Sequence, residues 1–217
     1  DQLNLTQKYD SPDISGSVKA DFTGNNIDNM EGSIQVDSLS FKTKPNEFFI
    51  DKFLVVASGH SLDRNLTISS DIINGEINGA YSFETIIPSL MNTFKGYLPA
   101  LINATQKKKL TKENNFSLLL TLENTEDISK TLKLPFTIVN QSRIVGHYNN
   151  RYNKFRVEAF LPGFRIGGSS FESGYLVCDN STEDVSIHVK ATNFNAKGLR
   201  NYIDFTANAK DDKINSL

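Results

Sequence analysis

The 217-residue sequence predicts a mainly β fold, built as a mostly antiparallel sheet with one longer amphipathic helix and one short helix. Short runs of alternating apolar and polar residues, such as 17–22 and 154–159, recur along the chain and are typical of half-buried strands. Polar turns such as Gly24–Asn26 separate them at short, regular spacing, which favours an antiparallel meander over strand–helix–strand crossovers. The apolar period changes to that of a helix in only two places, after Glu84 and after Thr125.

The first part of the chain, residues 1–83, is expected to form one β module. Apolar side chains that fall on one face of its expected strands are Val18, Ala20, Phe22, Ile34, Val36, Phe53, Val55, Leu66 and Ile68. A further strand carries Ile77 and Tyr81, and Asn74-Gly75 before it predicts a hairpin turn, because this dipeptide suits tight β-turns.

Residues 84–110 are expected to form the longer helix and a linker. Glu84 and Thr85 provide a helix start, Pro88 falls in the first turn where proline is tolerated, and Gly96 and Pro99 should end the helix. The apolar residues at helical spacing are Ile86, Ile87, Leu90, Met91, Phe94, Tyr97, Leu98, Leu101 and Ile102. A face this apolar must cover another apolar surface. Lys107–Lys109 follow, either as a solvated linker or as a contact with anionic lipid headgroups.

Residues 111–217 are expected to form a second β module. Thr125 can cap a short helix that ends before Pro135 and buries Ile128 and Leu132, and Gly167-Gly168 predicts a turn. The apolar residues that alternate along its strands are Phe116, Leu118, Leu120, Leu122, Phe155, Val157, Ala159, Val185, Ile187, Val189 and Ala191. Residues 49–56 resemble residues 171–178, which suggests a repeating β architecture.

The sequence contains no arrangement of residues that predicts catalysis or metal binding. The formal charge of −2 argues against nucleic acid as a partner, since phosphate binding needs a basic surface. The three histidines are far apart and lack metal-ligand neighbours, and Cys178, the one cysteine, reads as a small buried apolar side chain. No stretch of about 20 apolar residues predicts a membrane-spanning helix. We therefore expect a protein that is not an enzyme and needs no cofactor.

Three blocks of sequence resemble the TamB-type members of the AsmA-like superfamily, in particular their large Bacteroidetes representatives. The first is the strand pattern of Gly32–Phe41, and the second is that of Asp51–Ala57. The third is the stretch Ser70–Tyr81 followed by a helix that ends in Tyr97-Leu98-Pro99. The resemblance extends over nearly the whole chain at the level of pattern, and the third block is its most telling part.

The resemblance implies a fold, a location and partners. TamB-type proteins are long chains anchored in the inner membrane by an N-terminal helix, and they cross the periplasm as a curved sheet, the β-taco, with an apolar interior. They are implicated in moving phospholipid to the outer membrane and, with a partner β-barrel protein, in outer-membrane protein assembly. On this view the chain is a single internal segment of a larger repetitive β protein, and membrane anchoring belongs to parts that are absent from it.

The resulting expectation is a periplasmic trough whose apolar face binds or conducts phospholipid acyl chains. Which strand face lines the trough stays open, because a one-residue slip inverts every strand. The candidate groove residues are Val18, Phe22, Ile34, Val36, Phe53, Val55, Leu66, Ile68, Ile77, Tyr81, Phe116, Leu118, Leu120, Phe155 and Val157. The residues expected to cover the groove are Ile86, Leu90, Met91, Phe94, Leu98 and Leu101. The alternatives are a scaffold for outer-membrane protein assembly with a closed β core, and a small-ligand-binding β module of the extracellular kind.

Overall fold

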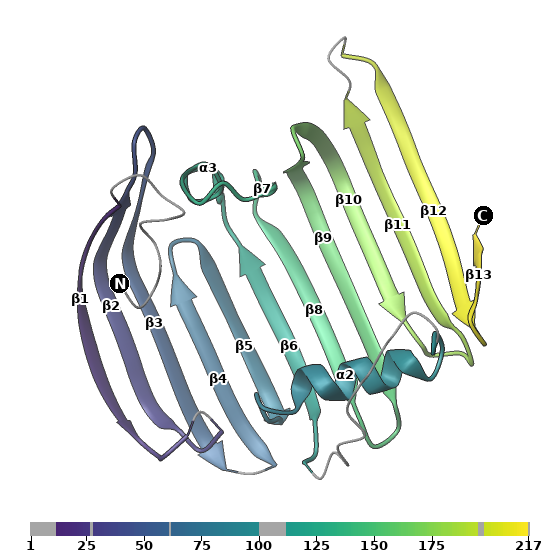
Figure 1. Cartoon of the computed structure of the whole chain (residues 1–217), viewed down its shortest axis with the longest axis horizontal. Helices are drawn as coiled ribbons and strands as arrows, with labels where there is room; N and C mark the ends of the chain where they lie inside the picture. The colour runs from purple at the N-terminus through teal and green to yellow at the C-terminus, as the bar shows by residue number, and fades with distance from the viewer. Residues whose placement is uncertain (1–11, 27, 61, 100–111, 195–197, 217) are drawn as a thin grey trace.

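The computed structural model describes residues 12–26, 28–60, 62–99, 112–194 and 198–216. They form one antiparallel 13-stranded sheet in which the strands follow almost entirely in sequence order (Figure 1). The strands are β1 (Asp13–Thr23), β2 (Glu31–Lys42), β3 (Glu47–His60), β4 (Asp63–Ser70), β5 (Ile73–Ala80), β6 (Asn115–Leu122), β7 (Phe136–Ile138), β8 (Ser142–Asn149), β9 (Lys154–Ile166), β10 (Ser169–Asp179), β11 (Val185–Phe194), β12 (Arg200–Lys210) and β13 (Lys213–Ser216). The helices are α2 (Ile86–Lys95) and α3 (Glu126–Thr131).

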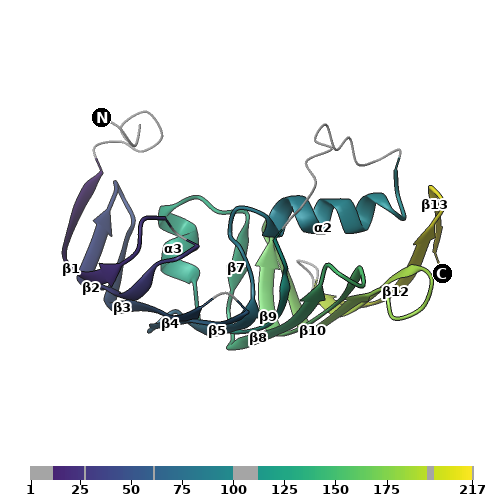
Figure 2. The ribbon, with the colours of Figure 1, turned by 90° about the horizontal axis from the view of Figure 1, so that it is seen from below.

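The sheet is curved and does not close on itself, which confirms the trough-like β fold (Figure 2). Both helices lie on its concave side: α2 crosses the strands near one end, and α3 contacts β3 and β7 near the other. Strand β7 pairs with the far end of β9, while β8 pairs with the rest of it. The two expected β modules join within this one sheet, because β5 pairs directly with β6.

The expected hairpin turn at Asn74-Gly75 is wrong. Both residues lie inside β5, where Asn74 pairs with Ser69, and the turn is made by Asp71 and Ile72. The hydroxyl of Ser70 accepts hydrogen bonds from the backbone N–H groups of Ile72 and Ile73, each at 3.1 Å, and so closes the turn without an Asn-Gly pair. Gly75 has another role, since a side chain there would collide with Leu120 on β6.

Helix α2 is shorter than expected and ends at Lys95, with Gly96 as its C-terminal cap. Thr85 is the residue before its first turn, as expected, but its hydroxyl makes no capping bond and accepts a hydrogen bond from the Asn114 side chain instead. The expected helix residues Leu101 and Ile102, and the lysines at 107–109, lie outside the described residues.

Helix α3 begins after Thr125 and ends before Pro135, as expected, but its buried residues are Ser129 and Thr131. Ile128 and Leu132 are only half-buried, so the expectation that they form its buried side is wrong. The reason is a hydrogen bond. The Ser129 hydroxyl donates to the carbonyl of Phe136, at the start of β7, and so turns the side of the helix that carries Ser129 toward this strand.

Candidate functional site: an apolar trough on the concave face

The concave face carries two long rows of apolar residues that run across the strands. Directly paired residues of neighbouring strands point to the same face, so the register defines each row. Row one is Ala20, Ile34, Val55, Ile68, Gly75, Leu120, Ile144, Ala159, Leu176, Val189 and Phe205. Row two is Phe22, Gly32, Ala57, Leu66, Ile77, Leu118, Gly146, Val157, Cys178, Ile187 and Ala207. With neighbouring strands about 4.8 Å apart, each row is on the order of 50 Å long.

Every candidate groove residue named from the sequence lies on this concave face. Val18, Val36 and Phe53 pair across β1, β2 and β3, next to row one. At the other side of the rows, Phe116 pairs with Tyr148, which pairs with Phe155. Phe155 shows that this face is the concave one, because its ring centroid lies 4.9 Å from that of Phe94 on α2, and α2 lies on the concave side.

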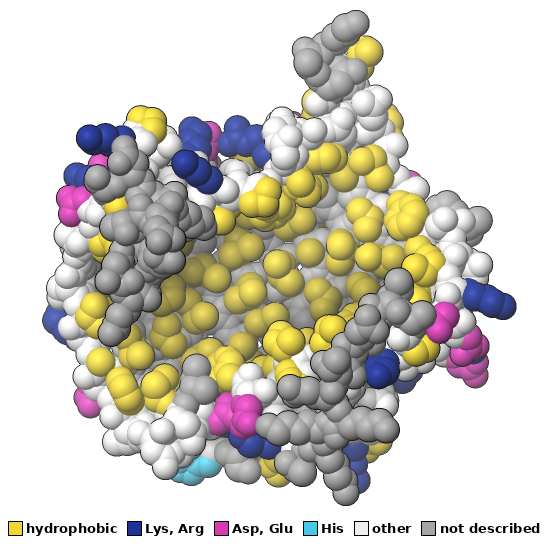
Figure 3. Space-filling view, in the orientation of Figure 1, with side chains coloured by type: hydrophobic (Ala, Val, Ile, Leu, Met, Phe, Trp, Pro, Cys, Tyr) yellow, Lys and Arg dark blue, Asp and Glu magenta, His cyan; other side chains and the backbone are white. Residues whose placement is uncertain are grey.

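The concave face is apolar but only partly covered. Leu66, Tyr81 and Phe155 are buried, Val18 and Phe22 are exposed, and the other candidate groove residues are half-buried. The space-filling view shows a broad hydrophobic surface inside the hollow (Figure 3). In the described part of the chain, α2, α3 and the adjacent loops are the only cover, so no second sheet completes a closed core. We call this surface the apolar trough.

The opposite, convex face is more polar over the same strands, although it carries some apolar residues such as Leu119 and Val145. One of its rows is Ser58, Asn65, Asn78, Ser117, His147, Arg156, Asp179, Ser186 and Asn208. The apolar trough is therefore the side of the sheet that differs from an ordinary protein surface.

Most apolar residues of α2 and of the turn after it pack on the trough, but Ile87 and Met91 are exposed. Ile86 contacts a buried cluster that includes Leu66, while Leu90, Phe94 and Leu98 contact a second cluster around Phe155. Met91 is 43% exposed and does not cover the trough, so its assignment as a groove-covering residue is wrong. The helix turns Ser89 and Thr93 to the sheet instead, and this rotation moves Met91 to the solvent side.

Three buried polar residues fix α2 to the sheet. At its centre, the Tyr148 hydroxyl is 3.0 Å from Ser89 Oγ and 3.1 Å from Thr93 Oγ1. Before its first turn, Asn114 Nδ2 donates to Thr85 Oγ1, and after its last turn, Asn180 Nδ2 donates to the Tyr97 hydroxyl at 2.8 Å. Asn114 and Asn180 are fully buried, so each bond lies in a place where an unpaired polar group would be costly.

The variant Tyr148→Phe tests the central attachment. It leaves the buried hydroxyls of Ser89 and Thr93 without their shared partner, so we expect a loss of about 1–2 kcal/mol in the free energy of unfolding. Urea unfolding measures this loss, and amide exchange should be faster in α2 than in the sheet. Adding Ser89→Ala to Tyr148→Phe should cost less than Ser89→Ala alone. Equal costs would contradict the attachment.

A second polar cluster holds the segment before β2 against the start of α2. Asp28 accepts hydrogen bonds from the Ser82 hydroxyl and the Phe83 N–H and forms an ion pair with Lys112 at 2.9 Å. The guanidinium of Arg64, which is 5% exposed, lies 3.9 Å from the same carboxylate. Burial by itself raises the pKa of Asp28, but the hydrogen bonds and the Lys112 charge outweigh it and hold the pKa below its usual value.

Two apolar hollows lie in the trough. The first, of about 360 Å³, lies beneath α2, and its lining exposes no polar surface. The second, of about 250 Å³, lies toward β7 and includes Leu161, Phe164 and Phe171. Leu176 lines both hollows. Cys178 is half-buried in the wall of the first, where burial raises the pKa of its thiol, as expected of an apolar rather than a reactive cysteine.

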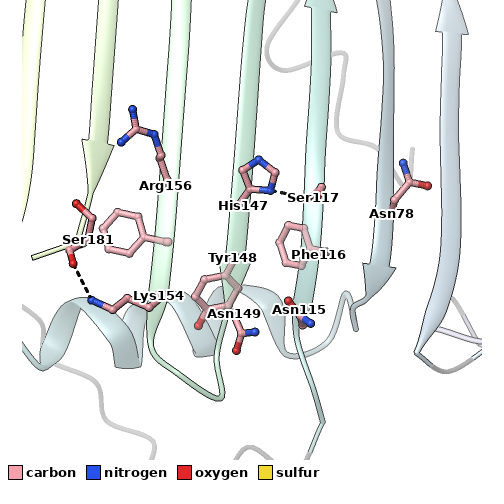
Figure 4. Close-up of a pocket in the computed structure, with 11 residues that line it drawn as sticks. Asn78, Asn115, Phe116, Ser117, His147, Tyr148, Asn149, Lys154, Arg156 and Ser181 are labelled. Atoms are coloured by element: carbon pink, nitrogen blue, oxygen red, sulfur yellow. Dashed lines mark hydrogen bonds between the residues drawn. The ribbon is translucent and has the colours of Figure 1, made fainter.

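The convex face has a recess in which Ser117 and His147 lie side by side (Figure 4). Ser117 Oγ is 3.1 Å from His147 Nδ1, which on distance alone would suit a nucleophile and a base. A catalytic histidine also needs a group that orients it, and among the described residues no carboxylate is hydrogen-bonded to His147. Its neighbour in the row is Arg156, which is paired with Glu158 and Asp179. We interpret the pair as an ordinary cross-strand contact.

The sequence did not reveal several residues that shape the trough. Ile144 and Leu176 continue row one, but Val145 and Val177 follow them directly, so no clean apolar–polar alternation marked which of the two neighbours faces the trough. No local signal marks Asn114 or Asn180, since asparagine at the end of a strand normally indicates a turn.

In the described part of the chain, neither helix is long and apolar enough to cross a membrane. Comparison with protein-family models, with curated proteins and with solved structures finds no match to this chain.

Proposed function

We propose that the protein binds the hydrocarbon chains of lipids along its apolar trough. The observation that carries the proposal is the pair of apolar rows that crosses the sheet from β1 to β12 while most of its members stay partly exposed. A soluble protein rarely exposes so large a contiguous apolar surface unless something apolar binds there.

The physical basis is simple desolvation. Each buried CH₂ group contributes about 0.8 kcal/mol, so every carbon of an acyl chain that lies on the trough rather than in water lowers the free energy of the lipid. Most members of the rows are aliphatic, so a guest chain can move along the open part of the trough while it stays in contact with apolar side chains. Polar headgroups would stay at the open rim, where they keep their hydration.

The wider setting rests on the resemblance to TamB-type proteins. On the strength of that resemblance we propose that the chain lies in the periplasm, as part of a longer protein anchored in the inner membrane, and takes part in phospholipid transport and outer-membrane biogenesis with a β-barrel partner. A lipid-binding trough fits that setting. The scaffold alternative, which requires a closed β core, is less well supported because α2 and α3 leave most of the concave face uncovered in the described part of the chain.

The proposal is tested by native mass spectrometry of the full chain, purified without detergent and then incubated with vesicles of phosphatidylethanolamine and phosphatidylglycerol. We expect phospholipid adducts either on the protein as purified or on the protein after incubation with the vesicles. A polar β protein of similar size serves as the control for nonspecific adducts. Protein that stays free of lipid in both samples would contradict the proposal.

A further inference from the structure

The hollow beneath α2 is a roofed part of the otherwise open trough. Leu90 and Phe94 of α2 form its roof, and Leu118, Gly146 and Val157 form its floor. Its lining exposes no polar surface, and its volume is about 360 Å³, within the range of small-molecule sites.

The hollow lies where row two lacks a side chain. Gly146 sits between Leu118 and Val157 on the neighbouring strands, and it is one of two glycines in the row, the other being Gly32 on β2. A Cβ at this position would be 3.5 Å from the Cβ of Leu118, which is ordinary van der Waals contact, and its backbone does not require glycine. Close packing therefore does not force the choice of glycine, and a larger residue would fill the hollow.

The hollow is closed at the rim of the sheet and opens toward the centre of the trough. At the rim, Phe116, Tyr148 and Phe155 form an aromatic wall, and Tyr148 is hydrogen-bonded to α2 above it. Beyond that wall, the fully buried Asn180 ties the end of α2 to the sheet. On the opposite side lies Leu176 of row one, which also lines the second hollow. Among the described residues, the side of the hollow that is continuous with the trough is therefore the one at Leu176.

We propose that this hollow receives the methyl end of a fatty acyl chain, with α2 acting as a fixed roof rather than as a plug that lipid displaces. The proposal rests on the lipid binding proposed above and adds the orientation of the guest. The tail goes in first because every lining surface is apolar and the nearby Tyr148 hydroxyl already has its partners. A carboxylate or phosphate in the hollow would be buried without a hydrogen bond.

The test uses the full chain and two fatty acids, one with a diazirine near its methyl end and one with a diazirine near its carboxyl group. After irradiation, the methyl-end probe should label peptides that contain Leu90 or Val157, and the carboxyl-end probe should not. Amide exchange of α2 should stay the same or slow down when palmitate binds. The reverse labelling pattern, or faster exchange in α2, would overturn the proposal.

A matched pair of variants on β8 separates the hollow from the trough. Gly146→Leu fills the hollow, so we expect about a tenfold weaker affinity for palmitate, loss of methyl-end labelling and a melting temperature that is unchanged or higher. Val145→Leu adds its carbon on the convex face, next to Gly146, and should leave all three unchanged. Unaltered palmitate binding by well-folded Gly146→Leu would overturn the proposal.

The single cysteine offers a measurement that needs no variant. Cys178 lines the hollow, so bound palmitate should slow its reaction with a maleimide in the wild-type protein. Palmitate that binds without protecting Cys178 would sink this proposal and leave lipid binding intact. Absence of any palmitate binding would count against the proposed function itself.

Discussion

Leu120→Arg should weaken lipid binding about thirtyfold. Leu120 lies in the middle of row one, paired with Gly75 on one side and Ile144 on the other. A guanidinium there interrupts the apolar path and costs the guest the burial of two or three CH₂ groups, or about 2 kcal/mol. Titration with a fluorescent fatty acid measures the change in affinity, and urea unfolding confirms that the variant is folded.

Its matched control is Leu119→Arg. Leu119 is the neighbouring leucine on the same strand, is also half-buried, and faces the convex side, where it pairs with Glu76 and Val145. The charge, the strand and the size of the change are the same, so only the face differs. If both variants lose lipid binding equally, the loss comes from damage to the sheet and not from the trough.

Asp28→Ala should destabilise the fold by about 3 kcal/mol. The substitution removes the partner of the Ser82 hydroxyl, of the Phe83 N–H and of Lys112, and it leaves the buried Arg64 without a nearby carboxylate in this cluster. The free energy of unfolding in urea measures the loss. A cost below about 1 kcal/mol would show that the cluster contributes little to holding α2 and β2 together.

The same cluster makes a prediction about pH. The pKa of Asp28 is lower in the folded state than in the unfolded chain, where it is about 3.9. Its contribution to stability is therefore fully present above that unfolded value and is lost as the pH falls through the folded pKa. Asp28→Asn removes the titrating group, so its stability deficit relative to the wild type should shrink as the pH is lowered from 6 to 3, and a constant deficit would contradict the assignment.

The strands and their apolar faces were predictable because alternation is a local property. Phe155, Val157 and Ala159, for example, lie on one face as expected, and Val157 and Ala159 extend the rows of Leu118 and Leu120. What the sequence could not provide was the choice of face. The register and the position of α2 make that choice, and both depend on contacts between residues that are far apart in the chain.

Alternation fails where a strand kinks, and those positions have no clear sequence signal. On β3, Ile50 is buried, Asp51 and Lys52 are both exposed, and the pattern resumes at Phe53. On the neighbouring β2, Ser38 has a φ of 54°, a conformation that serine rarely adopts. After such a break in the alternation, odd-numbered and even-numbered residues of the same strand can lie on the same face of the sheet.

The side of α2 that faces the sheet could not be predicted from the local sequence pattern either. The helix was expected to turn its widest apolar stripe, including Met91, to the sheet, yet its buried centre is Ser89 and Thr93. That rotation follows from the Tyr148 hydroxyl, which comes from β8 and needs polar partners once it is buried. Only the fold brings these residues together.

The most direct test of lipid binding in the trough compares photo-crosslinkers at Phe53 and Leu54 in cells. These neighbours on β3 are both half-buried, but Phe53 faces the trough beside row one and Leu54 faces the convex side. We expect the crosslinker at position 53 to capture lipid, detected by mass spectrometry, and the one at position 54 to capture none. Lipid at neither position, or equally at both, would contradict the account.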